Sequence, residues 1–257
     1  MSVNGKTILI TGGNSGIGLA TARLLLENGA RVAITGRDQA KLDAAVAELA
    51  GDVLGIKADV NNLADIDVVV KTLTEAFGSL DVVFANAGIS GATPLGNTTL
   101  EAFESIVRTN LTSVFFTVQG VLPLLKEGSS VILNGSVMRE LGSPGSSAYS
   151  ATKGAITSMA KVFASELAPK GIRVNTVIPG ATRTPIWTRG SRAGSTVDAT
   201  EKAMAPRIPM GRFSDPEELA QAVMFLASNA SSGMTAAEIV VDGGNIGAPW
   251  GIPLFRG

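Results

Sequence analysis

Residues 11–18 read TGGNSGIG, and this glycine-rich stretch decides the fold of the 257-residue chain. It follows an apolar run at Thr7–Thr11 and opens a helical pattern at Gly16–Asn28. Glycines let the backbone turn sharply after a strand, and the free N–H groups of the next helix attract a phosphate. The spacing Gly-x3-Gly-x-Gly matches neither the G-x-G-x-x-G fingerprint nor a Walker A loop. We predict a dinucleotide-binding turn; the alternative is a tight strand-to-helix connection without a ligand.

Short apolar runs alternate with helical patterns along the rest of the chain. Runs such as ILI, VAI, VVF and VIL are typical of strands buried on both faces of a parallel sheet. The predicted strands are 7–11, 31–35, 53–58, 81–85, 130–134, 172–177 and 238–241, and the predicted helices are 16–28, 39–49, 62–77, 99–126, 147–168 and 215–228. This alternation predicts an α/β fold: one Rossmann-like, doubly wound domain over residues 1–257, with a seven-stranded parallel sheet and helices on both faces.

Two segments fall outside this alternation. Residues 182–211 are rich in Ser, Thr, Gly and Arg, and loops of this length in compact domains are usually functional. We therefore predict a substrate loop or lid there, with a tolerated surface insertion as the alternative. Residues 243–257 form a mostly apolar tail that includes Trp250 and Phe255, and we predict that it is buried at a subunit interface.

The composition excludes several classes of function. The chain has 21 Lys and Arg against 22 Asp and Glu, a formal net charge of −1, so we expect neither a nucleic-acid nor a membrane partner. It contains no Cys and no His, which excludes thiol nucleophiles, Ser–His pairs and metal sites built on these residues. We predict no metal. The absence of a signal-peptide pattern and of an apolar run of about 20 residues predicts a cytoplasmic protein.

The end of the second predicted strand favours NADP(H) as the cofactor. In dinucleotide-binding folds an acidic residue here binds the ribose 2′-hydroxyl, whereas an arginine accommodates a 2′-phosphate. The strand runs into Gly36 and Arg37, and no carboxylate occurs before Asp38. Arg37 can make charge-assisted hydrogen bonds to phosphate, while Asp38 either pairs with Arg37 or caps the next helix. NADP(H) is the predicted cofactor, and NAD(H) is the alternative.

Tyr149 and Lys153 form the most plausible acid–base pair. Tyr149 is the single tyrosine of the chain, and Lys153 follows it at the i+4 position, on the same face of a helix. A nearby ammonium favours the phenolate and lowers the pKa of a phenol. Ser136 follows the fifth predicted strand, at the edge where open α/β sheets bind ligands. The alternative for each residue alone is an ordinary solvated helix face or turn.

These motifs, in this order, resemble those of the short-chain dehydrogenase/reductase family along essentially the whole chain. The residues that carry the resemblance are TGGNSGIG at 11–18, Asp59, Asn86-Ala87-Gly88, Asn110, Ser136, Tyr149-x3-Lys153, and Pro179-Gly180 followed by Thr184. In the enoyl-reductase relatives the Tyr and Lys are farther apart. Three positions depart from the family pattern: Ala85 replaces the first Asn of Asn-Asn-Ala-Gly, Asn134-Gly135 precedes Ser136, and no basic residue lies within Gly12–Gly18.

The resemblance implies a catalytic tetrad of Asn110, Ser136, Tyr149 and Lys153. In it Tyr149 is the acid–base, Lys153 lowers its pKa and holds the nicotinamide ribose, and Ser136 orients the substrate oxygen. Asn110 supports a water that connects Lys153 to solvent. The implied cofactor-binding residues are Gly12, Asn14, Ser15, Gly16, Ile17, Gly18, Arg37, Asp59, Val60, Asn86, Ala87, Gly88, Tyr149, Lys153, Pro179, Gly180, Thr182 and Thr184. For Asn86 and Asp59, a turn residue and a helix-leading cap are the alternatives.

The predicted substrate end lies beyond the later strands and is mostly apolar. The substrate residues we predict are Ser136, Met138, Tyr149, Ile186 and Trp187, with Ile89 and Ser90 as further candidates. The chain is thus predicted to be an NADP(H)-dependent oxidoreductase of carbonyl reductase or alcohol dehydrogenase type, which interconverts a ketone or aldehyde and its alcohol. The resemblance implies a homotetramer or homodimer. The alternatives are an NAD-linked dehydrogenase of a sugar, steroid or hydroxy acid and a non-catalytic dinucleotide-binding regulator.

Overall fold

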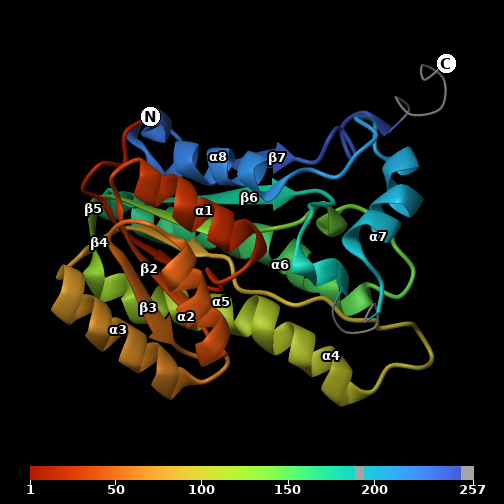
Figure 1. Cartoon of the computed structure of the whole chain (residues 1–257), viewed down its shortest axis with the longest axis horizontal. Coiled ribbons are helices and arrows are strands. Elements are labelled where there is room, and N and C mark those ends of the chain that lie inside the picture. The colour runs from red at the N-terminus through yellow and green to blue at the C-terminus, as the bar shows by residue number, and fades with distance from the viewer. Residues whose placement is uncertain (189–193, 250–257) are drawn as a thin grey trace.

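Seven parallel strands form the centre of the molecule in a computed structural model that describes residues 1–188 and 194–249 (Figure 1). The strands are β1 (Thr7–Ile10), β2 (Arg31–Gly36), β3 (Val53–Lys57), β4 (Leu80–Ala85), β5 (Leu125–Asn134), β6 (Arg173–Pro179) and β7 (Glu238–Val241). Their order in the sheet is β3-β2-β1-β4-β5-β6-β7. The predicted doubly wound, seven-stranded parallel sheet is confirmed.

Helices cover both faces of this sheet. They are α1 (Gly16–Glu27), α2 (Gln39–Glu48), α3 (Leu63–Phe77), α4 (Leu100–Val107), α5 (Ser113–Val121), α6 (Ser147–Leu167), α7 (Val197–Met204) and α8 (Pro216–Ala227). The strand side chains Ile8 and Ile10 pack in one apolar cluster with α1, α2 and α8, whereas Leu9 packs in another with α3 and α5. Alternate side chains of β1 therefore face opposite helical layers, which explains its continuous apolar sequence.

The sheet order reverses between β1 and β4. The chain builds β1, β2 and β3 toward one edge and then crosses to β4 on the other side of β1. The loops after β1 and β4 therefore diverge above the sheet, which leaves a crevice at its carboxyl edge. The glycine-rich turn and Asn86 to Gly88 follow these two strands, so the fold brings both motifs to the crevice.

The prediction of one continuous helix over residues 99–126 is wrong in the interior of this range and at its end. It is divided into α4, a π-helix at Arg108–Thr112 and α5, and it closes in a 3-10 turn at Leu122–Leu124. Pro123 lies in that turn and lacks an N–H group for a helical hydrogen bond. β5 consequently begins at Leu125, five residues before the predicted strand.

The segment 182–211 is also more regular than the sequence predicts. It contains a 3-10 turn at Pro185–Thr188 and the helix α7, whose N-cap Thr196 accepts a hydrogen bond from the Ala199 N–H at 3.1 Å. Residues 189–193, and 250–257 of the predicted apolar tail, lie outside the described residues. None of the helices in residues 1–188 and 194–249 combines the length and apolar character needed to span a bilayer.

Candidate active site

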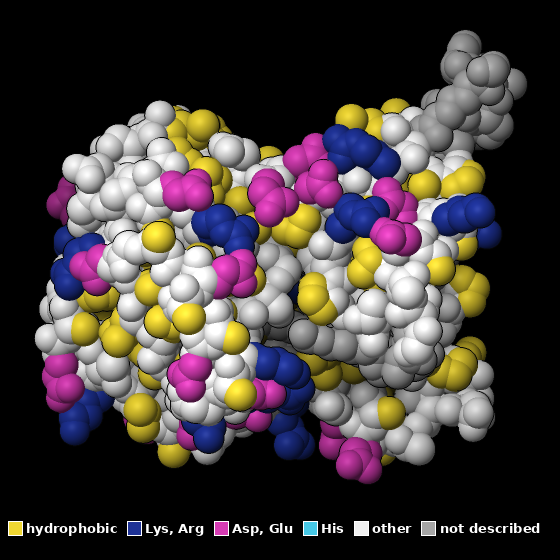
Figure 2. Space-filling model, in the orientation of Figure 1, with side chains coloured by type: hydrophobic (Ala, Val, Ile, Leu, Met, Phe, Trp, Pro, Cys, Tyr) yellow, Lys and Arg dark blue, Asp and Glu magenta, His cyan; other side chains and the backbone are white. Residues whose placement is uncertain are grey.

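A cleft of about 660 Å³ opens at the carboxyl ends of the strands. It is lined by Gly12, Asn14, Ser15, Gly16, Ile17, Thr35, Gly36, Arg37, Asp38, Lys41, Ala58, Asp59, Val60, Asn61, Asn86, Ala87, Gly88, Ile89, Ser90, Thr109, Asn134, Tyr149, Lys153, Thr184, Pro185 and Ile186. The space-filling view in Figure 2 shows the molecular surface hollowed near its centre, with cationic and anionic side chains beside the hollow. The volume lies within the range of small-molecule and cofactor sites.

The glycine-rich turn forms one wall of the cleft. Gly12 has a φ of +64°, and a Cβ atom there would lie 3.1 Å from the Cα of Ala87. Gly16 has a φ of +54°, and its Cβ would lie 3.1 Å from the Cβ of Thr184. L-residues with side chains rarely adopt this backbone conformation, and a side chain would displace the loops that follow β4 and β6. The two glycines therefore let three loops meet around the space.

Asn86 joins the loop after β4 to this turn. Its Nδ2 donates to the carbonyl oxygens of Thr11 and Gly12, at 3.0 and 3.3 Å. In return, the Thr11 hydroxyl accepts hydrogen bonds from the N–H groups of Asn86 and Ala87, each at 3.0 Å. The side chain of Asn86 therefore fixes the glycine-rich wall of the cleft, in addition to its place in a turn.

Tyr149 and Lys153 lie on α6 and both line the cleft. The Lys153 Nζ lies 5.6 Å from the centroid of the Tyr149 ring and donates to the main-chain oxygen of Asn134 at 2.7 Å. The Ser136 hydroxyl acts on the Tyr149 hydroxyl and lowers the pKa of the phenol. Ser136 begins the 3-10 turn Val137–Arg139 after β5, where its Oγ accepts from the Met138 N–H at 3.2 Å. The predicted acid–base pair and the predicted orienting hydroxyl are thus brought together.

Burial dominates the electrostatics of this pair. Burial raises the pKa of Tyr149 above its usual value of 10.0, and the hydrogen bond from Ser136 opposes this by stabilising the phenolate. Burial also lowers the pKa of Lys153 from 10.5 to about 8. Desolvation dominates the pKa of Tyr149 and the Lys153 ammonium is directed at the Asn134 carbonyl, so the lowering of the Tyr149 pKa by Lys153 stays a prediction.

Asn134 is a site residue whose role the sequence reasoning missed. Its Nδ2 donates to the Oδ1 of Asn86 at 2.9 Å. Because the Nδ2 of Asn86 faces two carbonyl oxygens, its Oδ1 must face Asn134, and this fixes the orientation of both amides. The Oδ1 of Asn134 is then buried, and no hydrogen-bond partner for it is found among the described residues. Through Asn134, Lys153 is connected to Asn86 and the glycine-rich turn.

Asn110 lies behind the cleft, in the π-helix between α4 and α5. It is 1% exposed, its Oδ1 accepts from the Ile89 N–H, and its Nδ2 donates to the Ile89 carbonyl, both at 2.8 Å. A second bond runs from Nδ2 to the Thr152 hydroxyl at 3.5 Å. The side chain therefore fixes the loop after β4 against α6. Its support of a water beside Lys153 stays a prediction.

Several predicted residues do not line the cleft. They are Gly18, Asn110, Ser136, Met138, Pro179, Gly180, Thr182 and Trp187. Gly18 packs on Asn86, since a Cβ there would lie 2.6 Å from the Asn86 Nδ2. The Trp187 indole donates to the Thr182 carbonyl at 2.7 Å, and its ring lies 5.1 Å from that of Phe213. Trp187 thus supports the segment after β6 in this structure.

The opposite end of the cleft, near β2 and β3, is charged. Asp38 caps α2, with its Oδ1 accepting from the Lys41 N–H at 3.2 Å, and its other oxygen lies 3.4 Å from the Lys41 Nζ. Of the two predicted alternatives for Asp38, the helix cap is therefore present. The Asp59 carboxylate accepts from the Asn61 N–H at 2.9 Å, while Asn62 caps α3. Asp59 is thus a turn residue and not the helix cap.

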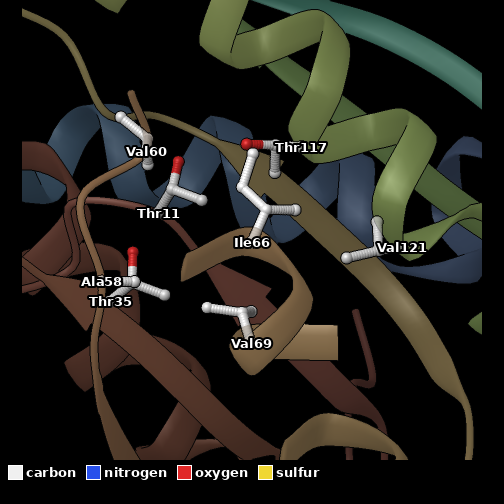
Figure 3. A pocket seen from close by; sticks show the side chains of 8 residues that line it. All are labelled: Thr11, Thr35, Ala58, Val60, Ile66, Val69, Thr117 and Val121. Carbon is white, nitrogen blue, oxygen red and sulfur yellow. The ribbon is translucent and has the colours of Figure 1, made fainter. Parts of the chain in front are cut away.

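A small cavity lies directly under this charged end. Its volume is about 10 Å³, close to the smallest that holds one water molecule. Its walls are Thr11, Thr35, Ala58, Val60, Ile66, Val69, Thr117 and Val121, which Figure 3 shows around it. Thr35, Ala58 and Val60 also line the large cleft, so they form a thin floor between the two spaces.

The chain is similar in sequence to known proteins. A family model described as enoyl-(acyl carrier protein) reductase matches residues 12–245. The chain is 42% identical over 244 residues to oxidoreductase asL5 of Sarocladium schorii, an alignment that covers 94% of this chain and 96% of that protein. It is 38% identical over 249 residues to the 3-oxoacyl-(acyl-carrier-protein) reductase FabG of Thermotoga maritima, covering 95% and 99%.

A solved structure shows the same fold with a nucleotide. The 3-ketoacyl-(acyl-carrier-protein) reductase of Brucella melitensis, complexed with NADH, is 32% identical to this chain and superposes with a TM-score of 0.87. The superposition covers 95% of this chain and 99% of that one. Fold and sequence similarity therefore agree over nearly the whole length of the chain.

Proposed function

The chain belongs to the short-chain dehydrogenase/reductase family, and from this premise we propose that it is an NADP(H)-dependent carbonyl reductase. It would interconvert a ketone or aldehyde and its alcohol. The observation that carries the proposal is the Tyr149 side chain, which lines the cleft with the Lys153 ammonium 5.6 Å from its ring. Members of this family bind a nicotinamide dinucleotide and act on small molecules.

The residues of the cleft fit such a dinucleotide. The turn after β1 presents the N-terminus of α1, whose first N–H groups are available to a phosphate. Gly12 and Gly16 keep side chains out of this space. Asn86 to Gly88 form the middle of the cleft, and Tyr149 and Lys153 form the nicotinamide end. When bound, the cofactor supplies or accepts the hydride.

Tyr149 would supply the proton in carbonyl reduction. Because its pKa is raised, the phenol is protonated at neutral pH and can donate to the oxygen of the substrate carbonyl. The Ser136 hydroxyl would orient that oxygen. Lys153, with its ammonium on the Asn134 carbonyl, would hold the ribose and balance the charge that develops on the phenol. This assignment gives each of the three side chains a separate task.

An apolar carbonyl compound is the substrate class that the cleft favours. Ile89, Pro185 and Ile186 line the cleft, and Tyr149 and Lys153 supply its polar groups near α6. The Tyr-x3-Lys spacing supports carbonyl chemistry over enoyl reduction. Two similar proteins are named as reductases of oxoacyl or ketoacyl groups, which are carbonyl compounds. The segment 182–211, which carries Ile186, would act as the substrate lid.

We also propose that the chain forms a tetramer or dimer and is located in the cytoplasm. Leu100, Phe103 and Phe115 of α4 and α5 are exposed apolar side chains, which suits a contact between identical subunits in a tetramer or dimer. The absence of Cys suits the cytoplasm, where disulfides are rare.

A spectrophotometric panel tests the proposed reaction. Oxidation of NADPH and of NADH is followed at equal concentrations with ketones, aldehydes and keto esters. We expect turnover with at least one apolar carbonyl compound, and faster turnover with NADPH than with NADH. Faster turnover with NADH would overturn the use of Arg37 for cofactor choice, and no turnover across the panel would favour the regulator hypothesis.

A further inference from the structure

Two cations and one carboxylate lie together where β2 meets α2. Arg37 follows the last residue of β2, Asp38 caps α2, and Lys41 lies in its first turn. All three line the cleft. The Lys41 and Asp38 side chains are 66% and 46% exposed, so both can rearrange around a ligand at little cost.

Asp38 serves two purposes that can be separated chemically. One of its oxygens accepts from the Lys41 N–H and so caps the helix, while the other lies 3.4 Å from the Lys41 ammonium. An asparagine caps a helix about as well as an aspartate. A neutral amide, however, cannot hold an ammonium as an ion pair does. Asp38 therefore competes with any anion that enters the cleft for the charge of Lys41.

Gly36, the residue before Arg37, leaves room for the side chain of Asn14. A Cβ atom on Gly36 would lie 2.8 Å from the Nδ2 of Asn14, so the glycine-rich turn lies directly against the end of β2. No carboxylate precedes Asp38 after β2, and Asp38 itself is engaged with α2 and Lys41. The cationic side chains that line this end of the cleft are those of Arg37 and Lys41.

We propose that Lys41 is a specificity-determining residue that binds the 2′-phosphate of NADP(H) together with Arg37. The inference rests on the proposed cofactor and adds a residue that the Gly12–Gly18 turn does not supply, since that turn contains no Lys or Arg. A phosphate monoester carries a charge of about −1.5 to −2 at neutral pH, which two cations neutralise better than one. The Lys41 ammonium exchanges Asp38 for this phosphate, and the Asp38 carboxylate limits the affinity.

Binding of two nucleotides, measured by isothermal titration calorimetry, tests this inference without turnover. Adenosine 2′,5′-bisphosphate and adenosine 5′-monophosphate differ only in the 2′-phosphate. The variants are Lys41→Gln, Asp38→Asn and, as a matched control, Lys71→Gln. Lys71 is an exposed lysine of α3 that lies 4.0 Å from Glu75 and does not line the cleft.

Lys41→Gln should weaken binding of the bisphosphate about two- to fivefold and leave the monophosphate unchanged, as loss of one exposed charge pair implies. Asp38→Asn should tighten the bisphosphate by about threefold, because the cap stays and the competing charge is removed. Lys71→Gln should bind both nucleotides as the unaltered chain does. Equal melting temperatures of the variants confirm that they fold.

The outcomes separate the inference from the proposed function. If the unaltered chain binds the two nucleotides equally well, the NADP(H) proposal fails, and the inference fails with it. If it prefers the bisphosphate but Lys41→Gln has the same preference, the proposed cofactor stands and Lys41 is not a determinant. An unchanged bisphosphate affinity in Asp38→Asn would overturn the competition by Asp38.

Discussion

The proposed chemistry depends on one residue, Tyr149, and on the proton of its hydroxyl. A buried phenol with a raised pKa is a poor base but a competent acid, since it keeps its proton at neutral pH. In the proposed reduction the phenol is therefore in the protonated form that can donate to the substrate near pH 7. Burial shifts the pKa of Lys153 in the opposite direction, to about 8, so this side chain loses its charge in weakly alkaline solution.

The pH dependence of reduction should report Lys153 and not Tyr149. Below pH 8 both groups are protonated, so kcat/KM should be flat; as the pH rises through about 8, Lys153 loses its charge and the rate should fall. Tyr149 would give a fall only above pH 10, since its pKa is raised. In Lys153→Arg, whose guanidinium does not titrate, the fall near pH 8 should be absent. A fall unchanged in that variant would contradict the assignment.

Asn134 connects Lys153 to the glycine-rich turn, and its removal should loosen the cleft. Asn134→Val deletes the 2.9 Å bond to Asn86 but keeps the main-chain oxygen that accepts from Lys153. We expect the Kd for NADPH, measured by fluorescence, to rise about three- to tenfold, the value of one net hydrogen bond. The alkaline fall in rate should stay near pH 8. Unchanged NADPH binding would show that the amide pair does not position the turn.

At the scale of elements, α7 is held by one arginine. Arg183 pairs with Asp198 and Glu201 of α7, and the other oxygen of Glu201 accepts from the Phe213 N–H at 3.0 Å. These contacts connect α7 to the start of the proposed lid after β6 and to the chain that leads into α8. A lid held in one place keeps the substrate pocket formed, so its release should lower apparent substrate affinity.

Arg183→Gln should therefore raise the substrate KM about three- to tenfold while nucleotide binding stays unchanged. A matched control is Arg212→Gln, which removes an arginine of the same region that bonds both oxygens of Glu218, at 2.7 and 2.8 Å. Glu218 completes the cap of α8, so this control should lower the melting temperature without altering KM. The same KM in both variants would refute a role for Arg183 in the lid.

The elements also show where sequence patterns stop being informative. The strands of the sheet were predictable because continuous apolar runs are required for burial on both faces. The π-helix at Arg108–Thr112 was not, because its extra residue per turn leaves the apolar spacing nearly helical. The start of β5 was missed because its first residues, Leu125 to Gly128, are mostly outside the core and lack the strand pattern.

At the scale of the whole molecule, the order of the strands brings separate sequence motifs together in one site. The glycine-rich turn, Asn86 to Gly88, and Tyr149 with Lys153 are far apart in sequence and meet at the carboxyl edge. Short motifs predicted these residues because their spacing is local. The Asn134–Asn86 pair was not predicted, because it depends on how the ends of two separate strands approach each other.

Self-association is the expected state of the whole molecule. Light scattering should give a mass that is a multiple of one chain, because α4 and α5 expose Leu100, Phe103 and Phe115. Phe115→Glu should reduce that mass, whereas Val68→Glu, at an exposed apolar position of α3, should leave it unchanged. A mass equal to one chain for the unaltered protein would refute the proposed assembly.

Single-turnover oxidation of enzyme-bound NADPH by a carbonyl substrate, in the unaltered chain and in Tyr149→Phe, tests the proposed chemistry most directly. Phenylalanine keeps the ring and removes only the proton donor, so NADPH should bind as before. The account predicts that the rate falls by about 10²- to 10⁴-fold, the usual contribution of a general acid. A Tyr149→Phe variant that binds NADPH and oxidises it at the original rate would contradict the account.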